Sequence, residues 1–284
     1  MKIGITAATG QLGKLVVESL KQKVASENIV VLVRTPEKAS DLGVETKAFD
    51  YSNKATQVEA LKGIDTLLLI SGSEVGQREA QHANVIASAK EAGVKKIVYT
   101  SVLHADTSTL SLAVEHIATE KNLKESGLTY TILRNGWYTE NYTGSIGGAL
   151  AGGAFIGSAG EGKIASAARI DFAEAAATVL ATEGHDGKVY ELAGDTAYTL
   201  TDLAAEISAQ TGKAIPFANL PEAEYAKILT SFGLPEFFAQ AIASWDVSAS
   251  QGDLFDDTKA LSALIGRPTT PLAETVKVTL AGLS

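Results

Sequence analysis

Short apolar runs recur along the first half of the chain and alternate with longer segments of helical spacing. The runs cover residues 3–5, 29–33, 66–70, 96–99 and 130–133. Between them, segments 11–24 and 77–92 repeat apolar residues every three or four positions, as an amphipathic helix does. Strands that alternate with helices form a parallel sheet with both faces covered and right-handed connections. We therefore predict an α/β fold with a Rossmann-type, doubly wound parallel sheet.

The second half of the chain predicts further core elements and a smaller lobe. A glycine-rich stretch at 143–162 is typical of a flexible loop over a pocket or of a pair of short strands, and we favour a loop that lines the site. Helices are expected at 171–182 and 201–210 with a strand at 188–192, and the helical segments 221–232 and 235–245 form a mostly helical lid. We divide the chain into a Rossmann core at 1–135 and a second part, 136–284, that holds the remaining core elements and the lid.

Composition narrows the function classes. The 284 residues include no cysteine, which excludes disulfides and thiolate chemistry, and the four histidines are scattered without the spacing of metal ligands. A net charge of −9 without a basic cluster argues against nucleic acid as a partner. No apolar run is long enough for a membrane span, and residues 2–6 resemble a strand rather than a signal peptide, so we expect a cytoplasmic protein.

The turn after the first apolar run has the small residues of a nucleotide-binding loop. The residues concerned are Thr6, Ala7, Thr9, Gly10, Gln11, Leu12 and Gly13. In such a loop a dinucleotide pyrophosphate meets the N-terminus of the first helix. Ala7 stands where related motifs have their first glycine, and it serves only if its backbone keeps to a conformation open to a residue with Cβ. An ordinary strand-to-helix turn is the alternative reading.

The end of the second apolar run indicates which dinucleotide binds. NAD-specific folds place an acidic residue there against the ribose 2′-hydroxyl, whereas a cation accommodates a 2′-phosphate. This chain has Arg34, with Lys38 one turn further on, and Asp50 and Tyr51 follow the next strand where they flank the adenine. We therefore predict NADPH rather than NADH, with solvent-exposed cations as the alternative role for Arg34 and Lys38.

Longer stretches carry a family resemblance. They are residues 9–13, 69–78, 99–106 and 133–138. In these stretches the chain resembles the NmrA-like atypical short-chain dehydrogenases, most of all their bacterial NADPH-dependent quinone oxidoreductases, and the related triphenylmethane dye reductases share much of this layout. The resemblance implies hydride transfer from NADPH to a quinone in the lid-covered site. It also implies that Ser71, Gly72 and Ser73 lie beside the nucleotide and Asn135, Gly136, Trp137 and Tyr138 near the nicotinamide.

The chain lacks the Tyr-x-x-x-Lys pair with which typical short-chain dehydrogenases protonate an alkoxide. In the helix expected at 111–126, Leu112 occupies the tyrosine position and His116 the lysine position. A quinone that accepts hydride becomes a weakly basic hydroquinone anion, so a strong acid is not required. We name His116 and Tyr138 as candidate catalytic residues. His116 has a structural role as its alternative, and Trp137 and Tyr138 are either walls of an aromatic pocket or core residues.

These features favour an NADPH-dependent reductase of quinones or similar flat acceptors. The second hypothesis is an NADP(H)-sensing regulatory protein without turnover, which the NmrA resemblance also allows and which would present a large apolar surface to a partner. A homodimer is expected only because such assemblies are common.

Overall fold

One parallel sheet organises the structure, a computed structural model that describes residues 1–283. Its order is β3-β2-β1-β4-β5-β6-β8. The strands are β1 (Ile3–Thr6), β2 (Ile29–Val33), β3 (Glu45–Ala48), β4 (Thr66–Leu69), β5 (Lys96–Val102), β6 (Thr129–Asn135) and β8 (Val189–Leu192). The chain order reverses between β1 and β4, which creates the crevice where doubly wound sheets bind ligands. The predicted Rossmann-type fold is confirmed.

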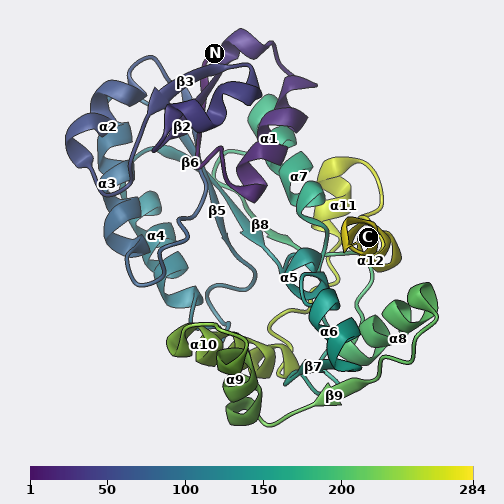
Figure 1. The fold of residues 1–284 in the computed structure, drawn as a ribbon. Helices are drawn as coiled ribbons and strands as arrows, with labels where there is room; N and C mark the ends of the chain where they lie inside the picture. The colour runs from purple at the N-terminus through teal and green to yellow at the C-terminus, as the bar shows by residue number, and fades with distance from the viewer. Residues whose placement is uncertain (284) are drawn as a thin grey trace.

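Helices cover both faces of the sheet (Figure 1). One face carries α1 (Gln11–Lys21), α7 (Arg169–Ala181) and α11 (Ala260–Ile265), and the other carries α2 (Lys54–Leu61), α3 (Arg78–Glu91) and α4 (Ala113–Glu125). Every residue of β1, β2 and β4 is buried, as expected for strands that are covered on both sides. Two apolar clusters, one on each face, therefore hold the sheet and position its carboxyl edge.

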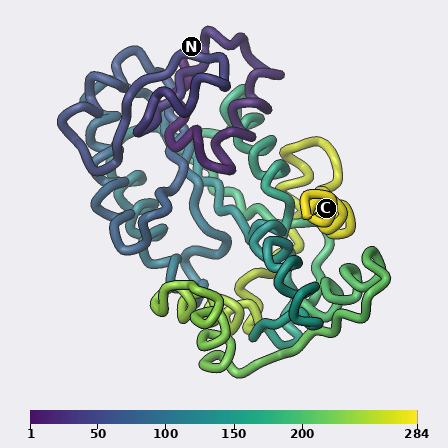
Figure 2. The backbone as a smooth tube through the Cα atoms, in the orientation of Figure 1, coloured from purple at the N-terminus to yellow at the C-terminus, as the bar shows by residue number. Residues whose placement is uncertain are grey.

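A small lobe packs beyond the carboxyl edge of the sheet. Its elements are α5 (Thr139–Thr143), α6 (Ile146–Gly152), β7 (Phe155–Gly157), α8 (Leu200–Thr211), β9 (Phe217–Asn219), α9 (Glu222–Ser231), α10 (Glu236–Ser250) and α12 (Leu272–Leu283). The tube in Figure 2 shows the C-terminal helix α12 returning to lie beside α5 and α6, and these pairs are in contact. Within residues 1–283, no helix combines the length and apolar character needed to cross a bilayer.

The glycine-rich stretch is not the loop that we expected. It forms α6 and β7, and β7 pairs in parallel with the distant β9. Ile146 is fully buried, which anchors α6 despite its glycines, and Gly153, with φ of 78°, ends that helix in a left-handed conformation. The prediction of a loop was wrong because packing against elements far along the chain decides this segment, although the segment does line the site described below.

Candidate active site

The turn between β1 and α1 is tightly closed. The Gly10 N–H donates to the Ala7 carbonyl at 2.9 Å, and a Cβ at Gly13 would lie only 2.4 Å from that same oxygen. Ala7 has φ of 50°, a left-handed conformation that a residue with Cβ adopts at some cost. The small residues of the motif therefore allow α1 to start directly against the turn, with its free N–H groups at the carboxyl edge of the sheet.

The predicted loop residues divide into two groups. Ala7, Thr9 and Gly10 line a cavity, whereas Gln11, Leu12 and Gly13 belong to α1 and do not. The Thr6 side chain is fully buried, donates to the Leu68 carbonyl at 3.0 Å and accepts from a backbone N–H of the segment after β4. Thr6 thus supports the turn from behind.

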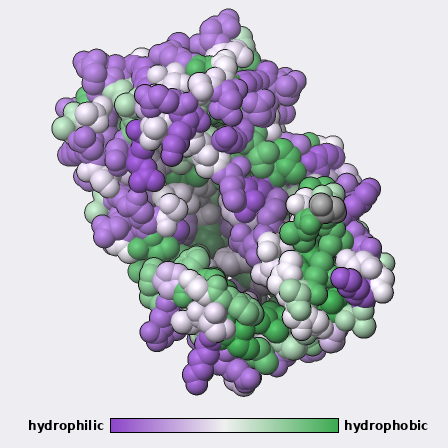
Figure 3. Space-filling view, in the orientation of Figure 1, coloured by the Kyte–Doolittle hydropathy of each residue, from purple (hydrophilic) through white to green (hydrophobic). Residues whose placement is uncertain are grey.

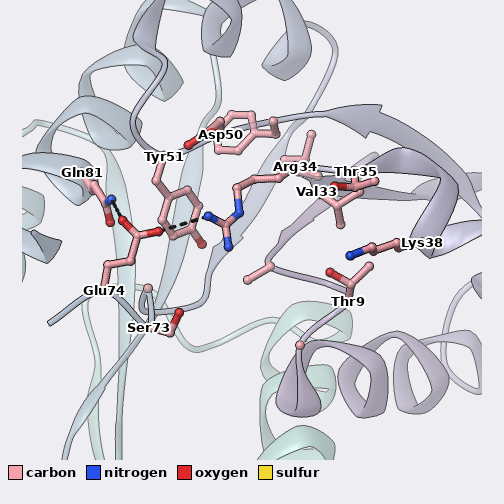
Figure 4. A pocket seen from close by; sticks show the side chains of 15 residues that line it. Thr9, Val33, Arg34, Thr35, Lys38, Asp50, Tyr51, Ser73, Glu74 and Gln81 are labelled. Atoms are coloured by element: carbon pink, nitrogen blue, oxygen red, sulfur yellow. Dashed lines mark hydrogen bonds and ion pairs between the residues drawn. The ribbon is translucent and has the colours of Figure 1, made fainter. Parts of the chain in front are cut away.

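The cavity beside this turn has a volume of about 280 Å³ and is shown in Figure 4. It is lined by Ala7, Thr9, Gly10, Leu32, Val33, Arg34, Thr35, Lys38, Phe49, Asp50, Tyr51, Gly72, Ser73, Glu74 and Gln81. The structure therefore brings together most of the residues predicted to hold the adenosine half of a dinucleotide. We call this first cavity the adenosine cavity. Arg34 and Lys38 are its two cations, and Arg34 is paired with Glu74 at 3.1 Å.

A second and larger cavity of about 880 Å³ lies between the sheet edge and the small lobe. Among the predicted site residues, it is lined by Ser71, His116, Asn135, Gly136, Trp137 and Tyr138. The space-filling view shows the surface hollowed between the two halves of the molecule, with apolar residues gathered below the hollow (Figure 3). We call this the acceptor cavity.

Helix α10 supplies the aromatic wall of the acceptor cavity. The rings of Trp137 and Trp245 meet edge to face at 5.7 Å, and Phe238 packs on Trp245 at 6.0 Å. The indole N–H of Trp245 donates to the Ser111 hydroxyl at 2.9 Å, which ties α10 to the segment before α4. Such a wall suits a flat, conjugated ligand.

Two buried polar atoms at the acceptor cavity lack a hydrogen-bond partner within the described residues. They are Oδ1 of Asn135 and Nη1 of Arg78. A buried polar atom without a partner costs roughly 1–3 kcal/mol, so both atoms are suited to a ligand that supplies the missing bond. A nicotinamide riboside offers hydroxyl and amide donors for the first atom, and a developing negative charge on an acceptor suits the second. The residues present therefore fit a nicotinamide dinucleotide that extends from one cavity to the other.

His116 lies on α4 and faces the acceptor cavity as a neutral imidazole. Its Nδ1 is 2.7 Å from the Tyr99 hydroxyl, and burial, reinforced by the positive charge of Arg78, lowers its pKa to about 3. Burial raises the pKa of Tyr99, which therefore keeps its proton. If that proton is donated to Nδ1, the His116 Nε2 carries the hydrogen of the ring.

Tyr138 packs as a wall rather than beside a base. Arg169 stacks over its ring at 4.7 Å and Phe172 meets it edge to face at 5.2 Å. Burial raises the pKa of its phenol, although a hydrogen bond with Asn135 opposes that rise. A phenol with a raised pKa is a weak acid, so the geometry favours a role for Tyr138 in shaping the cavity.

Sequence reasoning gave no role to several residues that the site uses. Arg78, Glu74 and Gln81 lie in or after the 69–78 stretch, and only the resemblance drew attention to that stretch. Asp246 on α10 also lines the acceptor cavity, where burial raises its pKa to about 6. A buried carboxylate within a helix leaves no pattern of spacing, so nothing local in the sequence identifies it.

This fold and these two cavities define a Rossmann-type dinucleotide-binding protein with a site for a second ligand. The model of the NAD(P)H-binding family matches residues 7–183, and the chain belongs to that family. Within it, the chain is 58% identical to quinone oxidoreductase 2 of Escherichia coli K12, over 96% of this chain and 97% of that protein.

Solved structures agree with this assignment. The NADPH complex of the E. coli quinone oxidoreductase superposes with a TM-score of 0.96, at 58% identity, over 98% of this chain and 99% of that one. Triphenylmethane reductase from Citrobacter sp., complexed with NADP(H), gives a TM-score of 0.94 at 38% identity, over 98% of this chain and 100% of that one. The chain therefore shares its whole architecture, including the small lobe, with these reductases.

Proposed function

We propose that this protein is an NADPH-dependent quinone reductase that transfers hydride to a quinone, or to a similar flat acceptor, in the acceptor cavity. The observation that carries the proposal is the meeting of two unlike cavities at one sheet edge. One has Arg34 and Lys38 at the end of β2, and the other has an aromatic wall and an unpaired Asn135 amide oxygen. The NADPH complex of the E. coli relative supports the choice of cofactor.

The chain binds and orients the cofactor from both cavities. The turn at Ala7 and Gly10 and the N-terminus of α1 receive the pyrophosphate, and Arg34 with Lys38 receives the 2′-phosphate. Ser71 and Asn135 hold the nicotinamide end, with Oδ1 of Asn135 accepting a hydrogen bond. The bound NADPH supplies the hydride.

The acceptor needs charge stabilisation more than it needs acid catalysis. Hydride addition to a quinone gives a hydroquinone anion, and one proton completes the reduction. The buried guanidinium of Arg78 stabilises that anion through Nη1, which makes no hydrogen bond within the described residues, and the neutral His116 orients the acceptor by donating a hydrogen bond from Nε2. Solvent supplies the proton that completes the reduction. Tyr138 and Trp137 hold the flat ring system in place.

The large acceptor cavity also favours an enzyme over the alternative function, an NADP(H) sensor. A sensor needs only the dinucleotide site and a surface for its partner, whereas this chain encloses about 880 Å³ beside the nicotinamide residues. The cavity therefore favours turnover over sensing.

The direct test follows absorbance of the nicotinamide as NADPH or NADH is mixed with the protein and a small benzoquinone. Rapid oxidation of NADPH supports the proposal, and Arg34→Glu should lose NADPH use selectively. Lys23→Glu, an equal charge reversal at an exposed residue outside both cavities, is the matched control. Tight NADPH binding without oxidation by any quinone or dye would replace the proposal with the sensor.

We further propose that the protein works in the cytoplasm as a homodimer and without nucleic acid. The net charge of −9 supports the last point. Light scattering after size-exclusion chromatography tests the dimer, since a monomer at assay concentrations overturns it.

A further inference from the structure

The adenosine cavity holds a carboxylate at the position expected for the 2′-phosphate. Glu74 Oε1 lies 3.1 Å from Nη1 of Arg34, and Oε2 accepts from the Gln81 side chain at 2.8 Å (Figure 4). Arg34 directly follows β2, which is where dinucleotide-binding folds read the ribose 2′ position. The cation that would recognise the phosphate is thus already paired with an anion of the protein.

The loop that carries Glu74 is fixed on both sides of it. The Gly72 N–H donates to Nε2 of His82 at 3.0 Å, and the Gly76 N–H donates to a carboxylate oxygen of Glu115 at 2.9 Å. Gln81, which holds the Glu74 carboxylate, is itself buried and also donates to the Ser52 hydroxyl. The contacts of the loop and a buried partner thus hold this carboxylate beside Arg34 in the structure.

The formal charges of the cavity wall cancel. Arg34 and Lys38 share the cavity with Asp50 and Glu74, and among residues 1–283 no other charged side chain lines it. A 2′-phosphate brings about two negative charges, which the Glu74 carboxylate repels while it competes for Arg34. The same carboxylate is an acceptor for a free ribose 2′-hydroxyl, which is the contact that NAD-specific folds make with an acidic residue in the same part of the site.

We infer that Glu74 is a specificity-determining residue that weakens the binding of NADPH and admits NADH as a second cofactor. This inference rests on the proposed function, because it assumes that the 2′ position of the cofactor reaches Arg34. Glu74→Gln tests the charge of the carboxylate, because glutamine has nearly the same shape as glutamate but no charge. Glu79→Gln is the matched control, since Glu79 is exposed on α3 and lines neither cavity.

Calorimetric titration of the full-length protein measures the effect on binding without turnover. Because an exposed charge interaction is worth up to about 1 kcal/mol, Glu74→Gln should tighten NADPH about three- to fivefold and weaken NADH by a similar factor. Two fragments of the cofactors should show the same changes: Glu74→Gln should tighten the binding of adenosine 2′,5′-bisphosphate and weaken the binding of AMP. Raising the salt concentration should shrink the gain for NADPH, because these charges are exposed to solvent.

The outcomes distinguish the two proposals. If Glu74→Gln weakens both cofactors, the carboxylate instead holds Arg34 in place and the inference is overturned. If it changes neither cofactor while Arg34→Glu still abolishes discrimination, the cavity assignment stands and only the role of Glu74 fails. If Arg34→Glu instead leaves the discrimination between the two fragments as it is in the wild type, then the cofactor site of the proposed function is wrong.

Discussion

The hydroxyl of Tyr99 lies 2.7 Å from Nδ1 of His116, and both side chains are buried where α4 packs on β5. Tyr99 is not the tyrosine of the typical short-chain dehydrogenase pair, because Leu112 occupies that position, and its hydroxyl lies behind the histidine, on the far side from the acceptor cavity. The contact holds a neutral imidazole in one orientation at the acceptor cavity.

Removal of the imidazole should slow the reductive step more than it weakens cofactor binding. For His116→Phe we expect kcat with a benzoquinone to fall about 10- to 100-fold, because the hydrogen bond from Nε2 to the developing anion is lost, and the hydroquinone anion is a weak base that needs less support than an alkoxide. Tyr99→Phe should lower kcat by a smaller factor, because the imidazole remains and only its tautomer is no longer fixed. Steady-state kinetics and NADPH titration measure both effects. An equal loss of NADPH affinity would identify His116 as a cofactor-binding residue instead.

The buried histidines should make stability depend on pH in a defined window. Burial lowers the pKa of His116 to about 3 and that of His82 to about 4. In the unfolded chain each titrates near about 6.5, so the unfolded state binds more protons below that pH. The stability contributed by the neutral rings is therefore complete above pH 6.5 and is lost as pH falls towards 4.

Urea denaturation at a series of pH values measures this effect. The free energy of unfolding should fall by several kcal/mol between pH 6.5 and 4. His82→Gln should flatten that slope but lower the stability at pH 7, because the ring accepts from the Gly72 N–H and is hydrogen-bonded to Thr119. His185, which is only half-buried, is the comparison: burial lowers its pKa too, so His185→Gln should change the slope in the same sense but less than His82→Gln does. A wild-type slope equal to that of His82→Gln would contradict the assignment.

The Nη1 of Arg78, which has no hydrogen-bond partner within the described residues, should matter when negative charge develops on the acceptor. Its Nε donates to the Gly72 carbonyl at 2.6 Å, so the guanidinium is held in place, while Nη1 lies 3.9 Å from a Glu115 carboxylate oxygen and makes no hydrogen bond within the described residues. Arg78→Lys should lower kcat/KM for quinones by about 10- to 100-fold, somewhat less than the loss of an oxyanion donor, since a positive charge remains. The loss should grow for acceptors whose hydroquinones are more basic. A uniform loss across such a series would indicate a role in packing.

The sequence was sufficient for the sheet and for the adenosine cavity because both depend on local signals. Uniformly apolar runs such as β2 are buried on both faces, and the small residues from Ala7 to Gly10 form a single turn against which Gly13 of α1 packs. Arg34 was found from its place after β2. Each of these features can be identified within a window of a few residues.

The acceptor cavity could not be derived in the same way, because its parts come from distant elements. The pairing of β7 with β9, the contact of Trp137 with Trp245 and the link from Trp245 to Ser111 all join segments far apart in the chain. Helix α6 forms although its glycines disfavour it, because tertiary packing outweighs propensity. The resemblance marked 133–138 as one motif, yet Arg134 points away from the site into an ion pair with Glu120.

The left-handed conformation of Ala7 gives a test of the nucleotide loop itself. At φ of 50°, the Cβ of an L-residue costs about 1 kcal/mol, and glycine escapes that cost. Ala7→Gly should therefore leave the free energy of unfolding unchanged or raise it by up to about 1 kcal/mol, after the greater entropy of glycine in the unfolded chain is subtracted. Ala8→Gly is the matched control: Ala8 is fully buried with a negative φ, so this change should destabilise by about 1 kcal/mol. Urea denaturation of both variants measures the two changes in the free energy of unfolding, and NADPH titration verifies that the turn still binds the cofactor. Equal destabilisation by the two substitutions would mean that Ala7 carries no strain.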